Sequence, residues 1–85
     1  MKSAAVTVTT SPTLVVAADN FARRCYLHSS SGSLYIGGSD VTSANGLHMA
    51  NNTTLEIFVP TNETIYAVTA SSTHTMRVLT PDLDL

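Results

Sequence analysis

The feature that most constrains the fold of this chain is the period of two in its apolar residues. In 4–10 (AAVTVTT), Val6 and Val8 alternate with threonines, and in 53–59 (TTLEIFV) aliphatic residues alternate with polar or aromatic ones. Successive side chains of a β-strand point to opposite faces of a sheet, so this spacing is typical of strands with one buried face. Almost no stretch has the spacing of an amphipathic helix. The chain is therefore predicted to be all-β.

Seven short strands are predicted, each bounded by residues that favour turns. They span 4–10, 13–18, 23–29, 34–37, 53–59, 64–70 and 74–80. Short antiparallel strands at this close spacing indicate a small β-sandwich or barrel. In the strand 23–29, the alternation places Arg23, Cys25 and Leu27 on the more core-like face, with Arg24, Tyr26 and His28 on the other.

The 85 residues are predicted to form one domain, 1–85, with extended segments at both ends. Residues 1–12 are a possible N-terminal arm, because the first strand reads as an edge strand and stops before a proline. Residues 81–85 (PDLDL) form a C-terminal tail in which leucines alternate with aspartates. We expect at least one of these ends to lie on a neighbouring subunit. The candidate contact residues are Lys2, Val6, Val8, Pro12, Leu83 and Leu85.

The composition favours self-association. Only 12% of the residues are charged, about half of the usual share of about 25%, while 44% are hydrophobic. A chain of this length buries only roughly 60% of the surface that it exposes when unfolded, so its own core leaves a small stability margin. We therefore expect a folded domain that is stabilised by partner subunits.

The charge distribution argues against nucleic-acid and membrane partners. The four basic residues are outnumbered by six acidic ones, for a net charge of −2, and form no basic surface for phosphates. No apolar run approaches the roughly 18 residues of a membrane span. The first residues lack the apolar core of a signal peptide, so export by the usual route is not expected. The adjacent Arg23 and Arg24 are candidates for contact with an acidic partner surface, although a solvated strand end is the simpler interpretation.

The stretch YIGGSDVTSANGL, residues 35–47, is the most distinctive loop in the chain. Its glycine pair is not followed by a helix, which disfavours a phosphate-binding loop. Asp40 is the loop's single carboxylate and supplies too few of the six to eight oxygen ligands that Ca²⁺ takes. We interpret the loop as structural: the glycines supply positive φ or a bulge, Asp40 bonds to its own backbone, and Asn45-Gly46 makes a second turn. The structural residues are Tyr35, Gly37, Gly38, Asp40, Asn45 and Gly46.

No set of residues predicts catalysis, a metal site or a cofactor. Cys25 is the only cysteine, which excludes an internal disulfide, and it is predicted to be a buried, inert thiol. Residues 25 and 28 of one strand point to opposite faces, so His28 does not meet Cys25. No two histidines have the i, i+2 spacing of ligands on one strand.

The order of these features resembles a group of small tailed-phage virion proteins, found as capsid decoration proteins or head-fibre domains. The resemblance covers approximately residues 5–80, and its sharpest parts are YIGGSDVT (35–42) and the closing YAVTAS…RVL. Tyr35, Gly37, Gly38, Asp40 and Gly46 match the shared motif. The resemblance implies a β-sandwich or barrel on a phage particle and no catalytic residues.

The function implied by the resemblance is that of a homotrimer, made in the host cytoplasm, that binds the major capsid protein on the outside of the mature shell. An alternative is a head-fibre or tail module that recognises host-surface glycans. The absence of Trp and the presence of only three Tyr and two Phe weaken that alternative, because glycan sites usually present aromatic rings. An enzyme is the least favoured class.

Overall fold

The computed structural model describes residues 1–81, which form eight strands and no helix. The strands are β1 (Lys2–Val8), β2 (Thr13–Val16), β3 (Arg23–Ser29), β4 (Leu34–Gly37), β5 (Leu47–Met49), β6 (Thr54–Val59), β7 (Ile65–Val68) and β8 (His74–Thr80). The prediction of an all-β fold is confirmed. Because these residues contain no helix, none of them forms a helical membrane span.

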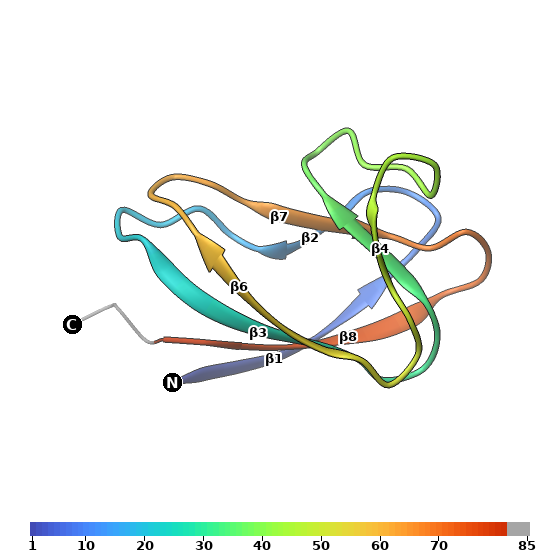
Figure 1. Cartoon of the computed structure of the whole chain (residues 1–85), viewed down its shortest axis with the longest axis horizontal. Helices are drawn as coiled ribbons and strands as arrows, with labels where there is room; N and C mark the ends of the chain where they lie inside the picture. The colour runs from blue at the N-terminus through green and yellow to red at the C-terminus, as the bar shows by residue number, and fades with distance from the viewer. Residues whose placement is uncertain (82–85) are drawn as a thin grey trace.

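The strands form two four-stranded antiparallel sheets that pack face to face (Figure 1). The β1 sheet has the order β1-β8-β3-β6, and the β2 sheet has the order β2-β7-β4-β5. Every connection except β4–β5 crosses from one sheet to the other. This is the connectivity of an eight-stranded jelly roll, a sandwich that is built from two Greek keys.

The hydrophobic core lies between the two sheets and contains the inward-facing side chains of every strand. Its largest fully buried members are Leu27, Leu34, Met49, Met76, Val8 and Val59. Burial alternates strictly along β3, where Arg23, Cys25, Leu27 and Ser29 are buried. This strand lies in the middle of its sheet, between β8 and β6. The two faces predicted for β3 are therefore confirmed.

The core is less well covered along the two edges of the β1 sheet. Three half-buried hydrophobic side chains pack against it from the side: Val6 on β1, and Leu55 and Ile57 on β6. Within residues 1–81, each of these strands has a hydrogen-bonded neighbour on one side only, β8 for β1 and β3 for β6. The expectation of an edge position for the first strand is confirmed.

The structure corrects the predicted number of strands from seven to eight. The missed strand is β5, which has three residues and pairs with β4 through Leu34–Met49, Tyr35–His48 and Ile36–Leu47. Within the predicted N-terminal arm, β1 pairs along its whole length with β8 of the same chain. Pro12 is exposed in the connection that takes the chain to the second sheet.

Candidate interaction surface

The outer face of the β1 sheet is an exposed surface with mixed apolar and polar side chains. Its residues come from the outward positions of all four strands, and the strand register places them in rows. One row is Ser3, Leu79, Tyr26 and Glu56, the next is Ala5, Arg77, His28 and Thr54, and Arg24 lies opposite Phe58. Tyr26, Leu79 and Phe58 are 39%, 38% and 53% exposed. Large apolar groups at these levels of exposure make this face a candidate for binding.

Polar contacts on this face order the side chains of β3 and β6. Nδ1 of His28 lies 2.9 Å from the hydroxyl of Thr54. The guanidinium of Arg24 lies 3.9 Å from Glu56 Oε1 and 5.8 Å from the centre of the Phe58 ring. Both charged groups are well exposed, so this ion pair adds little to stability. Its effect is to hold Arg24 along β6.

Glu56 also acts on Tyr26. Its carboxylate raises the pKa of the phenol, mainly because it accepts the phenol hydrogen in a hydrogen bond, and also because its negative charge disfavours phenolate. The positive charge of Arg24 acts in the opposite direction. Tyr26 is therefore held as a neutral group that presents its ring to solvent.

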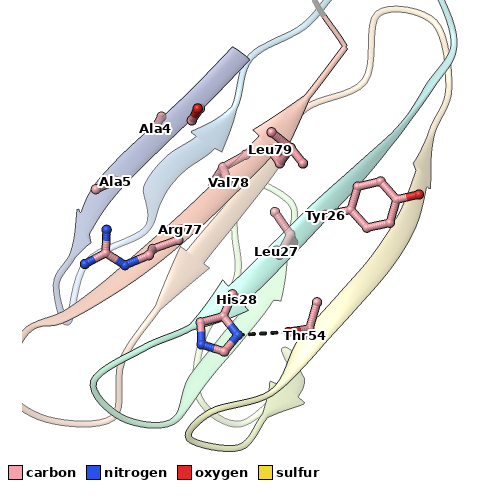
Figure 2. A pocket seen from close by; sticks show the side chains of 10 residues that line it. Ala4, Ala5, Tyr26, Leu27, His28, Thr54, Arg77, Val78 and Leu79 are labelled. Atoms are coloured by element: carbon pink, nitrogen blue, oxygen red, sulfur yellow. Dashed lines mark hydrogen bonds between the residues drawn. The ribbon is translucent and has the colours of Figure 1, made fainter. Parts of the chain in front are cut away.

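A shallow depression of about 390 Å³ lies across this face, between β1, β8, β3 and β6. Figure 2 shows Tyr26 on the β6 side and the His28–Thr54 contact at one end. Arg77 extends from β8 towards β1, on the side of Ala5 (Figure 2). Its guanidinium makes no ion pair within residues 1–81. The floor of the depression is thus apolar. Arg77 lies on one side of it and Glu56 beside Tyr26 on the other, an arrangement that suits binding to the surface of another protein.

The geometry of residues 1–81 provides no cluster of three or more His, Cys, Asp or Glu side chains for a metal ion. Cys25 is fully buried, and burial raises the pKa of its thiol despite the nearby Arg23. His28 lies on the opposite face of β3. His48 stacks on Tyr35 with ring centres 5.0 Å apart, on the outer face of the other sheet. The predicted burial of Cys25 is confirmed.

The distinctive loop is ordered by different side chains from those predicted. Asn45 Oδ1 accepts a hydrogen bond of 2.7 Å from the Thr42 N–H, and the Thr42 hydroxyl accepts bonds from the N–H groups of Ala44 and Asn45. The Gly46 N–H closes the turn on the Thr42 carbonyl. Asp40 contributes its backbone carbonyl, to Asn45, while its side chain makes no hydrogen bond within residues 1–81. The turn at Asn45-Gly46 is confirmed, and the bonding role of Asp40 is corrected.

None of the glycines of this loop has a positive φ, and the position that most clearly needs the absence of a side chain is Gly46. Neither Gly37 nor Gly38 has a positive φ, and Gly37 is the last residue of a regularly paired β4. A Cβ on Gly46 would lie 2.7 Å from Cβ of Tyr35 and 2.8 Å from Cγ2 of Val41. Val41 is buried although it lies in the loop. The loop thus packs against β4, which requires the absence of a side chain at Gly46.

Two residues that were expected at a subunit contact lie inside the chain instead. Val8 is fully buried in the core. Arg23 is only 8% exposed, and its guanidinium donates hydrogen bonds to the carbonyls of Phe21, at 3.2 Å, and Ala17. Arg23 therefore secures the β2–β3 connection and is not a surface cation. Lys2, Val6 and Arg24 remain at the surface or partly so, and Leu83 and Leu85 lie outside the described residues.

Hollows also lie along both open sides of the sandwich. On the β6 side, a groove of about 410 Å³ is lined mainly by apolar residues that include Ile36, Leu47, Ile57 and Phe58. On the β1 side, a hollow of about 310 Å³ is lined by residues that include Ala4, Val15 and Val78. These hollows show where each sheet edge leaves the core partly uncovered.

No motif in the sequence pointed directly to the outer face as a site. Tyr26, Phe58 and Leu79 were assigned to strands, but the register that aligns them depends on the order β8-β3-β6, which pairs strands far apart in the sequence. The only available signal was that each occupies the outward position of an alternating strand.

Comparison with protein-family models, curated proteins and solved structures found no match for this chain.

Proposed function

We propose that this chain is a capsid decoration protein, a structural protein that binds the outside of a mature phage shell as a homotrimer and stabilises it. The observation that carries the proposal is the outer face of the β1 sheet, where Tyr26, Leu79 and Phe58 are exposed around a shallow depression. Aromatic groups beside arginines are typical of the residues that dominate protein interfaces. The resemblance of YIGGSDVT and YAVTAS…RVL to small virion proteins supplies the biological setting.

The architecture is compatible with this role without selecting it. Jelly rolls occur in viral capsid proteins, and also in lectins and cupins. Because one fold serves many functions, the choice depends on the surface residues. An exposed face with an apolar floor and charged groups around it suits a protein partner, and the partner in this proposal is the major capsid protein.

The mechanism is thermodynamic linkage and requires no cofactor. A protein that binds the expanded shell but not the immature one stabilises the expanded state by its binding free energy at each site. One saturated site contributes about 2.7 kcal/mol when the free protein is at 100 times its Kd. Many equivalent sites on one shell multiply this effect. The protein would be made in the host cytoplasm and act on the capsid exterior.

The test is cosedimentation of the purified protein with expanded and immature shells of the phage that encodes it. We expect stoichiometric binding to expanded shells only. Leu79→Ser should weaken binding by roughly tenfold, the loss of about 1.4 kcal/mol typical of an interface anchor. Leu14→Ser is the matched control, because Leu14 is similarly exposed but lies on the other sheet. Equal binding to both shells, or none to either, would contradict the proposal.

A second candidate function is recognition of host-surface glycans by a head-fibre or tail module. The observation that favours it is the position of Tyr26 beside Glu56, with His28, Thr54 and Arg77 around the same depression. A ring next to hydrogen-bonding side chains is the arrangement that sugars require. Selective binding on a glycan array that is lost in Tyr26→Ala, and retained in Tyr35→Phe, would support this function over decoration.

A further inference from the structure

At both edges of the β1 sheet, hydrophobic side chains next to the core are only partly covered. Among the described residues, the half-buried hydrophobic side chains that pack against the main core lie on these edges, Val6 on β1, and Leu55 and Ile57 on β6. Within the described residues, neither strand has a neighbour on its outer side. An unpaired edge exposes backbone N–H and C=O groups that can template another strand. Pairing the two edges would cover both the backbone groups and the three side chains.

Strand direction allows one edge to pair with the other between copies. β1, β8, β3 and β6 alternate in direction, because each neighbouring pair is antiparallel, so β1 and β6 run in opposite directions. A second copy with the same orientation therefore brings its β6 antiparallel to β1. The lengths also match, with seven residues in β1 and six in β6.

We propose that copies of this chain associate head to tail, with β1 of one copy pairing with β6 of the next. This inference deepens the homotrimer of the proposed function and rests on it. Rotation about an axis along the strands preserves their direction, so these heterologous contacts form a closed ring when the rotation between neighbouring copies is one third of a turn, as the proposed homotrimer requires. A two-fold dimer would instead pair β1 with β1.

The sizes of the side chains, and the sheet face to which each points, favour one register for the pairing of β1 with β6 of the next copy. Outward side chains must stay outward, since a slip of one residue would turn the apolar positions to solvent. The outward residues of β1 are small and those of β6 include large ones. The register that places Ala5 opposite Glu56 of the next copy also pairs Ser3 with Phe58, Thr7 with Thr54, Ala4 with Ile57 and Val6 with Leu55. The inward Ala4 and Val6 then face the apolar groove beside β6.

Charge complementarity favours the same register. Arg77 is opposite Ala5 on β8, extends towards β1 (Figure 2), and makes no ion pair within residues 1–81. Ala5 is too small to block it. Glu56 of the next copy would lie just beyond Ala5, about two strand spacings or roughly 10 Å from the Arg77 backbone. The two long side chains can span that separation and meet over Ala5.

Cross-linking between two cysteine variants of the chain tests the proposal. Ser3→Cys and Phe58→Cys place thiols on exposed positions of the two edges, and the parent chain is the control because Cys25 is buried. A short bismaleimide should link chains in a mixture of the two variants and not in either variant alone. Linkage in Ser3→Cys alone would show β1–β1 pairing and overturn the proposal. A mixture with no linkage would overturn it as well.

A charge variant tests the contact without cross-linking. Ala5→Glu should shift the oligomer to monomer in size-exclusion chromatography with light scattering, because it repels Glu56 of the next copy while it pairs with Arg77 of its own chain. Ala44→Glu, at an exposed loop position, should leave the oligomer unchanged. Adding Glu56→Lys to Ala5→Glu should restore it. An unchanged oligomer in Ala5→Glu would count against this pairing.

Shell binding is measured separately on the same variants. If the protein is a trimer that binds expanded shells but shows no β1–β6 cross-link, the edge pairing is contradicted and the proposed function is not. Head-to-tail linkage in a protein that does not bind shells would support the edge pairing and contradict the proposed function.

Discussion

Gly46 and Gly38 belong to one loop but have different surroundings. A Cβ on Gly46 would lie 2.7 Å from Cβ of Tyr35, whereas a Cβ on Gly38 would meet only the mobile carboxylate end of Asp40, at 3.3 Å. Gly46→Ala should therefore lower the free energy of unfolding by about 1–3 kcal/mol, the usual cost of overpacking. Gly38→Ala should change it by less than about 0.5 kcal/mol. Urea unfolding of both variants measures the difference, and equal losses would contradict this account.

Arg23 and Arg24 are neighbours in sequence with opposite roles. Arg23 is buried and donates to the carbonyls of Ala17 and Phe21, while Arg24 makes an exposed ion pair. Arg23→Met should cost about 1.5–3 kcal/mol, because it removes the charge-assisted hydrogen bonds that a buried guanidinium donates to two backbone carbonyls. Arg24→Met should cost less than about 0.5 kcal/mol. Thermal unfolding of the two variants measures these costs. A larger loss of stability in Arg24→Met than in Arg23→Met would contradict the roles given to the two arginines.

Tyr26 should titrate at a higher pH than an ordinary tyrosine. Because its pKa is raised in the folded protein, the stabilising effect of Glu56 is fully present below the unfolded value of about 10 and is lost as pH rises through the folded value. Glu56→Gln should lower the pKa of Tyr26 in a residue-resolved NMR titration. Arg24→Gln should raise it further. Unchanged titration in both variants would exclude this electrostatic coupling.

The alternation of residues predicted which side chains of β3 face inward, but not what each one does there. Cys25 and Leu27 fill the core as expected. The hydrogen bonds of Arg23 depend on the path of 17–22, a connection with no periodic pattern. The role of Gly46 likewise depends on Val41 and Tyr35, which become its neighbours only when the loop packs on β4.

At the scale of elements, Ser29 joins the end of β3 to the connection between β5 and β6. Its hydroxyl donates to the Ala50 carbonyl and accepts a 3.1 Å bond from the Thr53 N–H. Its backbone groups also bond to Thr53 and Asn52. Ser29→Ala should lower the free energy of unfolding by about 1–3 kcal/mol, because it leaves the Thr53 N–H without this partner.

Hydrogen exchange locates the effect of Ser29→Ala. Amides of 50–53 should exchange faster than in the parent chain, while those of β7 should change little. Ser33→Ala, at an exposed position, is the control. A uniform change over all strands would show that Ser29 acts on the whole fold instead.

Seven of the eight strands were predictable because each is an alternating segment or, for β2, a short apolar run that lies between turn signals. β5 was missed because it has only three residues, too few to establish a period. Its alternation of Leu47, His48 and Met49 after the Asn45-Gly46 turn is visible in retrospect. What defines it as a strand is its register with β4, which is a property of the folded sheet.

At the scale of the whole molecule, the sequence predicted a small sandwich or barrel but not its strand order. The order β1-β8-β3-β6 places the first and last strands side by side, and the exposed Leu79 beside Tyr26. No local pattern encodes these pairings, because they depend on the contacts between segments distant in sequence. The outer face is therefore visible only in the structure.

Association should be detectable in the stability of the whole molecule. If copies bind one another only when folded, the unfolding temperature rises with protein concentration. We expect this rise in the parent chain and its loss in Ala5→Glu. Calorimetry over a wide range of concentrations measures it. A midpoint that does not depend on concentration in the parent chain would indicate a monomer.

The pairing of β1 with β8 has one further consequence. Lys2 lies directly opposite Thr80, at the end of the sandwich where the first strand begins and the last strand ends (Figure 1). Opposite residues in an antiparallel pair are only about 5 Å apart, so a short glycine-rich linker can join these two positions. Opening the chain in the exposed turn 70–73 would then give a circular permutant in which β8 is synthesised first and β7 last. Such a permutant would place peptide fusions at the opposite end of the sandwich.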